Sequence, residues 1–165
     1  MEIRQANCSD IETLMEIFEG AKGIMRSSGN LQQWNGAYPT VDVVRKDIED
    51  GNCYVLCDSE QILGTMALIP GPDPTYSYIE GAWPDEDKYY VIHRIATGLP
   101  GRNIARRMFD WAFEHISAQG YRVIRIDTHS DNCIMKHILS KYGFQMCGII
   151  YLQDGAPRDA YHLHR

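Results

Sequence analysis

Apolar residues recur along the chain at two different spacings, and each spacing predicts a different kind of element. Intervals of three and four residues predict helices that begin near residues 9, 40, 103 and 132. Short apolar runs predict strands, at residues 2–5, 53–57, 62–69, 89–97, 122–127, 145–152 and 160–164. In chain order the elements form the series βααβββαβαββ, which predicts a single α/β domain with a mixed sheet of about seven strands.

Polar residues mark the ends of several of these elements. Ser9 and Glu12 form a capping-box pattern that predicts the start of the first helix, and Thr40 is the expected cap of the second helix, which Gly51 ends. Residues 26–39 and 71–87 lack either period and are expected to be irregular. Both segments carry aromatic side chains, so they are candidates for binding loops as well as for covers of the core.

The segment from residue 89 to residue 120 is the most informative, because an apolar strand enters an amphipathic helix through a turn that contains glycine. The first N–H groups of a helix lack an intrahelical partner, and the peptide dipoles add partial positive charge, so such a turn can bind a phosphate. Gly101 lies in this turn, and Arg102 adds a forked donor that suits phosphate oxygens. The alternative is that the turn serves backbone geometry alone. It contains neither the G-x-G-x-x-G of a dinucleotide site nor the Gly-Lys-Ser/Thr of a P-loop.

Composition narrows the class of protein and of partner. The 165 residues are 44% hydrophobic and 23% charged, which is ordinary for one globular domain. A formal net charge of −6 and a pI near 5.4 argue against nucleic-acid or membrane-surface binding and mildly favour a neutral or cationic substrate. Because no apolar run is long enough to span a membrane and the N-terminus lacks a signal-peptide core, we expect a cytoplasmic protein.

Cysteines and histidines do not predict a redox or metal site. The five cysteines include no C-x-x-C pair and are expected to act as small apolar residues in a reducing compartment. The series Asp127, His129 and Asp131 is not followed by the glycine that a calcium loop needs. His162 and His164 share one face of the last predicted strand, and two imidazoles without a third nearby ligand are typical of surface polar residues. We therefore expect no metal.

The element order, with a phosphate-binding turn after the fourth strand, resembles that of the GNAT acyltransferases, the acetyl-CoA-dependent N-acetyltransferase superfamily. The resemblance extends over the whole chain in element order and is most specific at residues 91–144. Residues 94–97 are similar to the family's strand that pairs with the pantetheine arm, residues 101–105 to its pyrophosphate turn, and residues 127–144 to its second cofactor segment. The resemblance implies one GNAT-like α/β domain over residues 1–165, with helices on both faces of the sheet and with acetyl-CoA as acyl donor.

The resemblance also implies a set of cofactor-binding residues, namely Ile95, Ala96, Thr97, Gly101, Arg102, Asn103, Ile104, Ala105 and Asn132. The turn departs from the family pattern, because Pro100 replaces its first residue and Asn103 its central glycine, and it is about two residues shorter. Asparagine tolerates left-handed backbone better than other non-glycine residues. Leu139 stands where the family often has a general-acid tyrosine, and Tyr142 lies one turn further along the same helix.

The chemistry implied by the resemblance is direct attack of an amine on the acetyl thioester, with backbone N–H groups near residues 95–97 binding the developing oxyanion. The amine must first lose a proton. A histidine side chain titrates near neutral pH, so His93, on the strand beside the thioester, is the expected base. Glu80 is the alternative base or amine-binding carboxylate, and Tyr142 is the alternative proton-handling group. The competing interpretations are a buried strand histidine and a solvated loop acid.

The acceptor is expected to be a small primary amine held between residues 26–39 and 75–87. Trp34, Tyr38 and Trp83 can supply apolar or cation–π walls there. The alternative is that these aromatic residues close the core or a homodimer contact. Three functions remain open from the sequence: a small-molecule acetyltransferase, a protein N-terminal acetyltransferase, and a non-catalytic acyl-CoA-binding protein of the same fold.

Overall fold

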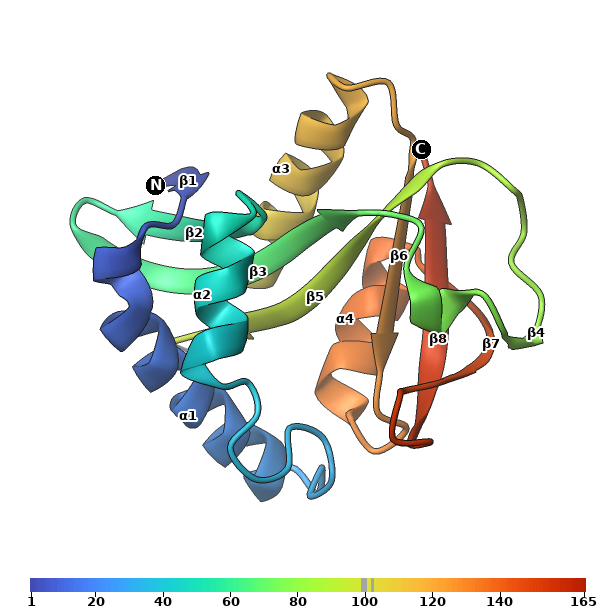
Figure 1. Ribbon diagram of the computed structural model, residues 1–165, viewed down its shortest axis with the longest axis horizontal. Helices are drawn as coiled ribbons and strands as arrows, with labels where there is room; N and C mark the ends of the chain where they lie inside the picture. Colours follow the sequence, from blue (N-terminus) through green and yellow to red (C-terminus); the bar gives the residue numbers. More distant parts are fainter. Residues whose placement is uncertain (99–100, 102) are drawn as a thin grey trace.

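The computed structural model describes residues 1–98, 101 and 103–165, which form one mixed β-sheet covered on both faces by helices (Figure 1). The strands are β1 (Glu2–Gln5), β2 (Cys53–Asp58), β3 (Gln61–Pro70), β4 (Glu80–Gly81), β5 (Tyr89–Thr97), β6 (Val123–Thr128), β7 (Gln145–Tyr151) and β8 (Pro157–His164). The helices are α1 (Ile11–Ser27), α2 (Val41–Glu49), α3 (Ile104–Ser117) and α4 (Cys133–Tyr142). Within the described part of the chain, no helix is both long and apolar enough to cross a membrane.

The predicted fold class is confirmed, with one more strand than expected. The described strands are arranged in the order β1-β2-β3-β5-β6-β8-β7-β4, with β5 and β6 as a parallel pair inside an otherwise antiparallel sheet. The additional strand is β4, whose two residues pair with β7 through Glu80↔Ile149 and Gly81↔Gly148. Two residues are too few to show the alternating pattern from which a strand is predicted.

The predicted cap of the first helix is wrong by two residues. The capping box is formed by Asn7 and Asp10 in place of Ser9 and Glu12. The side chain of Asn7 accepts the N–H of Ser9 at 2.9 Å, and the side chain of Asp10 accepts the N–H of Asn7 at 2.8 Å. This reciprocal pair starts a short 3₁₀ turn, Cys8–Asp10, that leads into α1. The predicted cap of α2 is confirmed, since the side chain of Thr40 accepts the N–H of Val43 at the start of this helix.

Two buried clusters hold the helices to the sheet. One joins α3 and α4 to the sheet and includes Phe109 and Leu139, and the other joins α1 and α2 to the opposite face and includes Phe18 and Val44. A Cβ at Gly64 of β3 would lie only 3.0 Å from the Ile104 side chain at the start of α3. Glycine at this position therefore lets the first turn of α3 lie directly against the sheet.

Candidate active site

The candidate site lies where the two parallel strands of the sheet stop pairing. The ladder between β5 and β6 ends at Val91↔Arg125, although both strands continue. Beyond it β5 carries a bulge, because Arg94 and Ile95 both lie between consecutive pairs with β3, and Arg94 has φ 49°. A bulge bends its strand, and β5 and β6 diverge toward their C-terminal ends (Figure 1).

Two cavities meet at this opening. The first, of about 690 Å³, lies between α1, the end of β5, the start of α3 and α4. The second, of about 1010 Å³, lies between residues 32–38, the middle of β5, the end of β6 and residues 152–158. Four residues line both cavities, which places the cavities next to each other at the β5 bulge: Met25, Ile95, Asn132 and Met135.

The first cavity gathers the predicted cofactor-binding residues that the structure describes. Those that line it are Ile95, Ala96, Thr97, Gly101, Asn103, Ile104, Ala105 and Asn132. Arg102 and Pro100, which the sequence also singled out, lie outside the described residues. Apolar side chains from α1 and α4 form much of the remaining wall, and the cations Arg106, Lys141 and Arg165 lie among the lining residues. The carboxylate of Asp110 also lines it, 3.9 Å from Arg106 and 3.9 Å from Arg165, so the cavity combines an apolar surface with a net positive charge.

Two described residues that precede α3, Gly101 and Asn103, both have positive φ. Asn103 caps the helix in the left-handed region, with φ 53° and ψ 32°, as expected for asparagine in place of glycine. Gly101 has φ 90°, and a Cβ there would meet nothing within 4 Å, so backbone conformation rather than space favours glycine. The N–H of Arg107 bonds the carbonyl of Asn103, so the N–H groups of residues 104–106 precede the first helical bond and are available to an anion.

Asn132 has a structural task at the boundary of the two cavities. Its Oδ1 accepts the N–H of Met135 at 3.0 Å and so caps α4, and its Nδ2 donates to Gln33 Oε1 at 2.8 Å. Gln33 Oε1 also accepts from Asn30 at 2.9 Å. The side chain of Asn132 thus fixes α4 against the 32–38 segment. Gln33 is not recognisable as a site residue from the sequence, because a glutamine in an irregular segment gives no signal of its partner.

The second cavity contains a histidine–carboxylate pair. His93 Nε2 lies 2.7 Å from Asp73 Oδ2, and Asp73 Oδ1 accepts from the backbone N–H and the hydroxyl of Thr75 at 2.9 and 2.7 Å. Burial acts to raise the pKa of Asp73, but the hydrogen bonds from His93 and Thr75 outweigh it and lower this pKa to about 2. A carboxylate that is ionised at neutral pH only accepts hydrogen bonds. His93 Nε2 must therefore carry the hydrogen, which leaves Nδ1 as the basic nitrogen of the neutral ring.

Two of the three predicted acceptor-binding aromatic residues line the second cavity. Trp34 packs edge-on against Phe18 of α1, with ring centroids 5.5 Å apart. The hydroxyl of Tyr38 accepts from Arg94 at 2.9 Å, and Arg94 forms a bidentate pair with Asp47 at 2.6 and 2.7 Å. The α2 carboxylate thus anchors the bulge of β5 and, through it, one aromatic wall of the cavity.

The side chains that line the second cavity carry an excess of negative charge. Its lining includes the carboxylates Asp73, Asp127 and Asp154. Two guanidinium groups, those of Arg94 and Arg158, also line it, and the charge of Arg94 is balanced by Asp47 of α2. A cationic ligand is therefore favoured over an anionic one in this cavity.

Three predicted site residues lie away from the second cavity. Glu80 is held at the sheet edge by the pairing of β4 with β7, and Trp83 packs over the guanidinium of Arg125 at 4.2 Å, so neither lines either cavity. The structure therefore does not bring these two residues to the cavity where we expected them to contact the acceptor. Tyr142 lines the first cavity, where its hydroxyl donates to Asp110 at 2.6 Å. Burial and this bond raise the pKa of Tyr142 above its ordinary value of 10.

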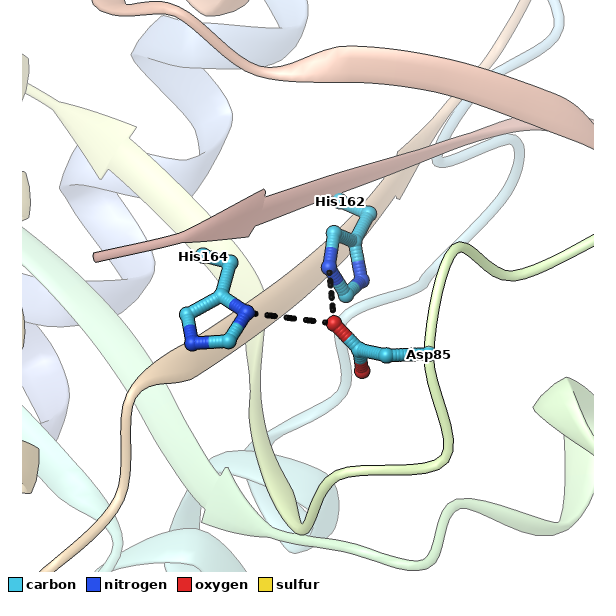
Figure 2. Close-up of side chains that lie close together, drawn as sticks. All are labelled: Asp85, His162 and His164. Atoms are coloured by element: carbon cyan, nitrogen blue, oxygen red, sulfur yellow. Dashed lines mark hydrogen bonds and ion pairs between the residues drawn. The ribbon is translucent and has the colours of Figure 1, made fainter.

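The structure also corrects the expectation that the two histidines of the last strand lack a third ligand. His162 and His164 of β8 both point toward the carboxylate of Asp85 in the loop between β4 and β5 (Figure 2). Asp85 Oδ2 lies 3.2 Å from His162 Nε2 and 3.2 Å from His164 Nδ1. None of the three residues lines either of the two cavities.

Comparison with known proteins identifies the family. The model of the acetyltransferase (GNAT) family matches residues 12–144. A GNAT-family acetyltransferase of Streptococcus agalactiae 2603 is 32% identical, with a TM-score of 0.82 over 99% of this chain and 95% of that chain. Among curated protein sequences, none matches this chain.

More distant structures share the fold. An acetyltransferase of the GNAT family from Listeria monocytogenes 4b F2365 is 21% identical, with a TM-score of 0.74 over 99% of this chain and 94% of that chain. The PaiA N-acetyltransferase of Thermoplasma acidophilum, solved in complex with coenzyme A, is 12% identical, with a TM-score of 0.74 over 99% and 98% of the two chains. At these identities the likeness concerns the fold alone.

Proposed function

Because the chain belongs to the GNAT acetyltransferase family, we propose that it transfers an acetyl group from acetyl-CoA to a small cationic primary amine. One observation carries the proposal: the first cavity, at the start of α3, meets the negatively charged second cavity at the bulge of β5. The His93–Asp73 pair lies in the second cavity. A two-substrate transfer needs such a shared boundary, because the acyl donor and the acceptor must come within reacting distance.

The first cavity suits coenzyme A in both charge and shape. The N–H groups at the start of α3 would hold the pyrophosphate, and Arg106, Lys141 and Arg165 would attract the phosphate groups. The apolar wall from α1 and α4 would cover the uncharged arm. Bound acetyl-CoA would supply an acyl group already activated for transfer. The backbone N–H groups of residues 95–97, at the boundary between the cavities, are our candidates to polarise the acyl carbonyl.

His93 is the proposed base. An ammonium group cannot attack, so one proton must leave the amine before the new C–N bond forms. The C–S bond of the thioester would then break, and the second proton of the amine nitrogen would go to the departing thiolate. His93 Nδ1 would take this proton while Nε2–H remains bonded to Asp73 Oδ2 at 2.7 Å, and the ionised carboxylate would stabilise the imidazolium that results. Asp73 is thus a positioning residue, which acts through the orientation and tautomer of His93.

The charge of the second cavity supports a cationic acceptor. Asp127 and Asp154 line it together with Asp73, and they would attract an ammonium group before it loses its proton. Trp34 and Tyr38 would supply aromatic faces to the same cation. A volume of about 1010 Å³ accommodates a small molecule with room for water.

An acceptor screen tests this function. Purified protein is incubated with acetyl-CoA and a panel of cationic, neutral and acidic primary amines, together with peptides that have free N-termini. Free thiol is measured, and mass spectrometry detects the gain of one acetyl group. We expect the highest kcat/KM for cationic aliphatic amines. Transfer only to peptide N-termini or acidic amines would overturn the choice of acceptor, and acetyl-CoA binding without any transfer would favour the non-catalytic alternative.

A further inference from the structure

A second cluster of chemically active side chains lies outside the two cavities, at the C-terminal end of β8. His162 and His164 are two residues apart on this strand, so their imidazoles lie on the same face of the sheet. Figure 2 shows both rings directed at Asp85, from the loop that follows β4. One nitrogen from each ring and one carboxylate oxygen lie within 4.8 Å of one another.

His162 is buried without the hydrogen bonds that a buried imidazole normally makes. Its side chain is 4% exposed, yet neither ring nitrogen has a hydrogen-bond partner in the described part of the chain. Nε2 approaches Asp85 Oδ2 at 3.2 Å without hydrogen-bond alignment. Buried polar side chains in folded proteins nearly always have a hydrogen-bond partner. The lack of one at Nε2, the nitrogen that faces Asp85, therefore indicates a partner other than a protein group.

Two of the three distances between the ligand atoms match those between neighbouring ligands of one tetrahedral metal ion. With metal–ligand bonds of about 2.0–2.1 Å, adjacent ligand atoms are separated by about 3.3 Å. Asp85 Oδ2 lies 3.2 Å from His162 Nε2 and from His164 Nδ1. Imidazole nitrogen and carboxylate oxygen are common zinc ligands. His164 is partly exposed, which leaves a route for an ion and a position for water as a fourth ligand.

Two charged residues surround the cluster, and they have opposite effects on the attraction for a cation. Asp87 Oδ2 lies 3.9 Å from His164 Nε2, the nitrogen that does not face Asp85, and adds negative charge beside the cluster. Arg125 lies 4.0 Å from Asp85 Oδ1 and weakens the attraction for a cation. Its guanidinium also donates to the backbone carbonyl of Asp85 at 2.9 Å, which holds the loop so that Oδ2 faces the histidines.

We propose that Asp85, His162 and His164 form a zinc site that fastens residues 82–88 to β8. The ion would join two segments that are far apart in the chain and would give a partner to Nε2 of the buried His162. Because none of the three residues lines either cavity, the site is structural and separate from acetyl transfer. It is independent of the proposed acceptor and base.

Zinc binding to the tag-free, chelator-treated protein tests the proposal. Equilibrium dialysis with metal analysis should find one Zn²⁺ per chain, and Zn²⁺ should raise the Tm because it binds the folded state. Co²⁺ in its place should give the intense visible absorption of a tetrahedral site. Asp85→Asn and His164→Gln should each weaken zinc binding at least tenfold and remove the rise in Tm, because each deletes a ligand.

His137→Gln is the matched control, because His137 is an exposed histidine on α4, outside the cluster. It should bind zinc like the wild type. The proposal is overturned if the wild type binds no zinc, or if Asp85→Asn and His164→Gln retain wild-type affinity. It is also overturned if His137→Gln weakens binding as much as they do. Should a variant fold poorly, the wild-type Co²⁺ spectrum decides, since absence of tetrahedral absorption contradicts the site.

Discussion

The two cavities that meet at the bulge of β5 are built in different ways. The first is lined by the end of a strand and by helices, and the groups that we propose to bind an anion there are backbone N–H groups at the start of α3. The second is lined by charged and aromatic side chains from five separate segments, among which Asp73 and His93 are bonded at 2.7 Å.

This difference predicts how each cavity responds to substitution. A backbone-built site depends on local conformation and tolerates many side chains, so only a change that alters the turn should disturb it. A site built from side chains depends on particular atoms, so one substitution can remove its chemistry while the fold persists. The four predictions that follow test this contrast, from the largest expected effect to the smallest.

His93→Gln should lower kcat by about 100-fold or more, because general-base contributions are of that size. The affinity for coenzyme A should stay close to that of the wild type, since His93 lines the second cavity and not the first. Steady-state kinetics and calorimetry measure the two quantities. Tyr142→Phe is the comparison, because the hydroxyl of Tyr142 is bonded to Asp110 in the first cavity. A larger loss from Tyr142→Phe than from His93→Gln would reverse the assignment of the base.

Asp73→Asn should lower kcat on the order of tenfold, less than His93→Gln, because it disturbs the tautomer and orientation of the base without removing it. KM for acetyl-CoA should change little. Thr75→Ala is the matched control, since it removes one hydrogen bond to Asp73 but leaves the contact between Asp73 and His93 in place. Equal losses in kcat from the two substitutions would indicate that the whole turn, rather than the carboxylate, matters.

The cofactor-binding residues proposed for the first cavity are easier to predict from the sequence than the residues of the second, because most of them lie in one continuous segment, whereas the second is built from distant side chains. The turn that we propose to bind phosphate is local: strand, glycine, left-handed asparagine and helix follow one another within residues 89–118, and each leaves a mark on the sequence. The order of elements also predicts the fold class. Prediction from the sequence is wrong where an element or a capping pattern is very short. Two-residue β4 has no period, and the cap at Asn7 lies just before the more familiar pattern at Ser9.

The second cavity depends on contacts between distant residues, which one sequence does not reveal. His93 was singled out from its position on a strand, but its partner Asp73 lies in a turn between two prolines and carries no mark of that contact. Glu80 and Trp83 were chosen because they lie in a long aromatic loop. The structure places that part of the loop at the sheet edge, where β4 pairs with β7. The sequence likewise does not reveal Asp85 as a neighbour of the β8 histidines, because the contact joins residues that are far apart in the chain.

Asn103→Val should weaken binding of coenzyme A by about tenfold, because a β-branched residue is strained by about 1–2 kcal/mol at φ 53° and about 1.4 kcal/mol corresponds to tenfold. Asn103→Gly should bind like the wild type, since glycine adopts this conformation freely. Calorimetric titration of both variants measures the difference. If Asn103→Gly loses as much affinity as Asn103→Val, the asparagine side chain contributes the binding, and the first cavity is not backbone-built.

The smallest expected effect is on stability in acid. The pKa of Asp73 in the folded protein is about 2, below its ordinary value of 3.8, so the ionised carboxylate stabilises the fold. For a lowered pKa, this stabilisation is fully present above the ordinary value and is lost as pH falls through about 2. The difference in the free energy of unfolding between the wild type and Asp73→Asn should therefore be constant near neutral pH and shrink between about pH 4 and pH 2. Urea unfolding at a series of pH values measures it, with Glu16→Gln, on the exposed face of α1, as a control for the loss of one negative charge. A difference that stays constant down to pH 2 would show that Asp73 is not held ionised by His93 and Thr75, and the side-chain network assigned to the second cavity would lose its electrostatic basis.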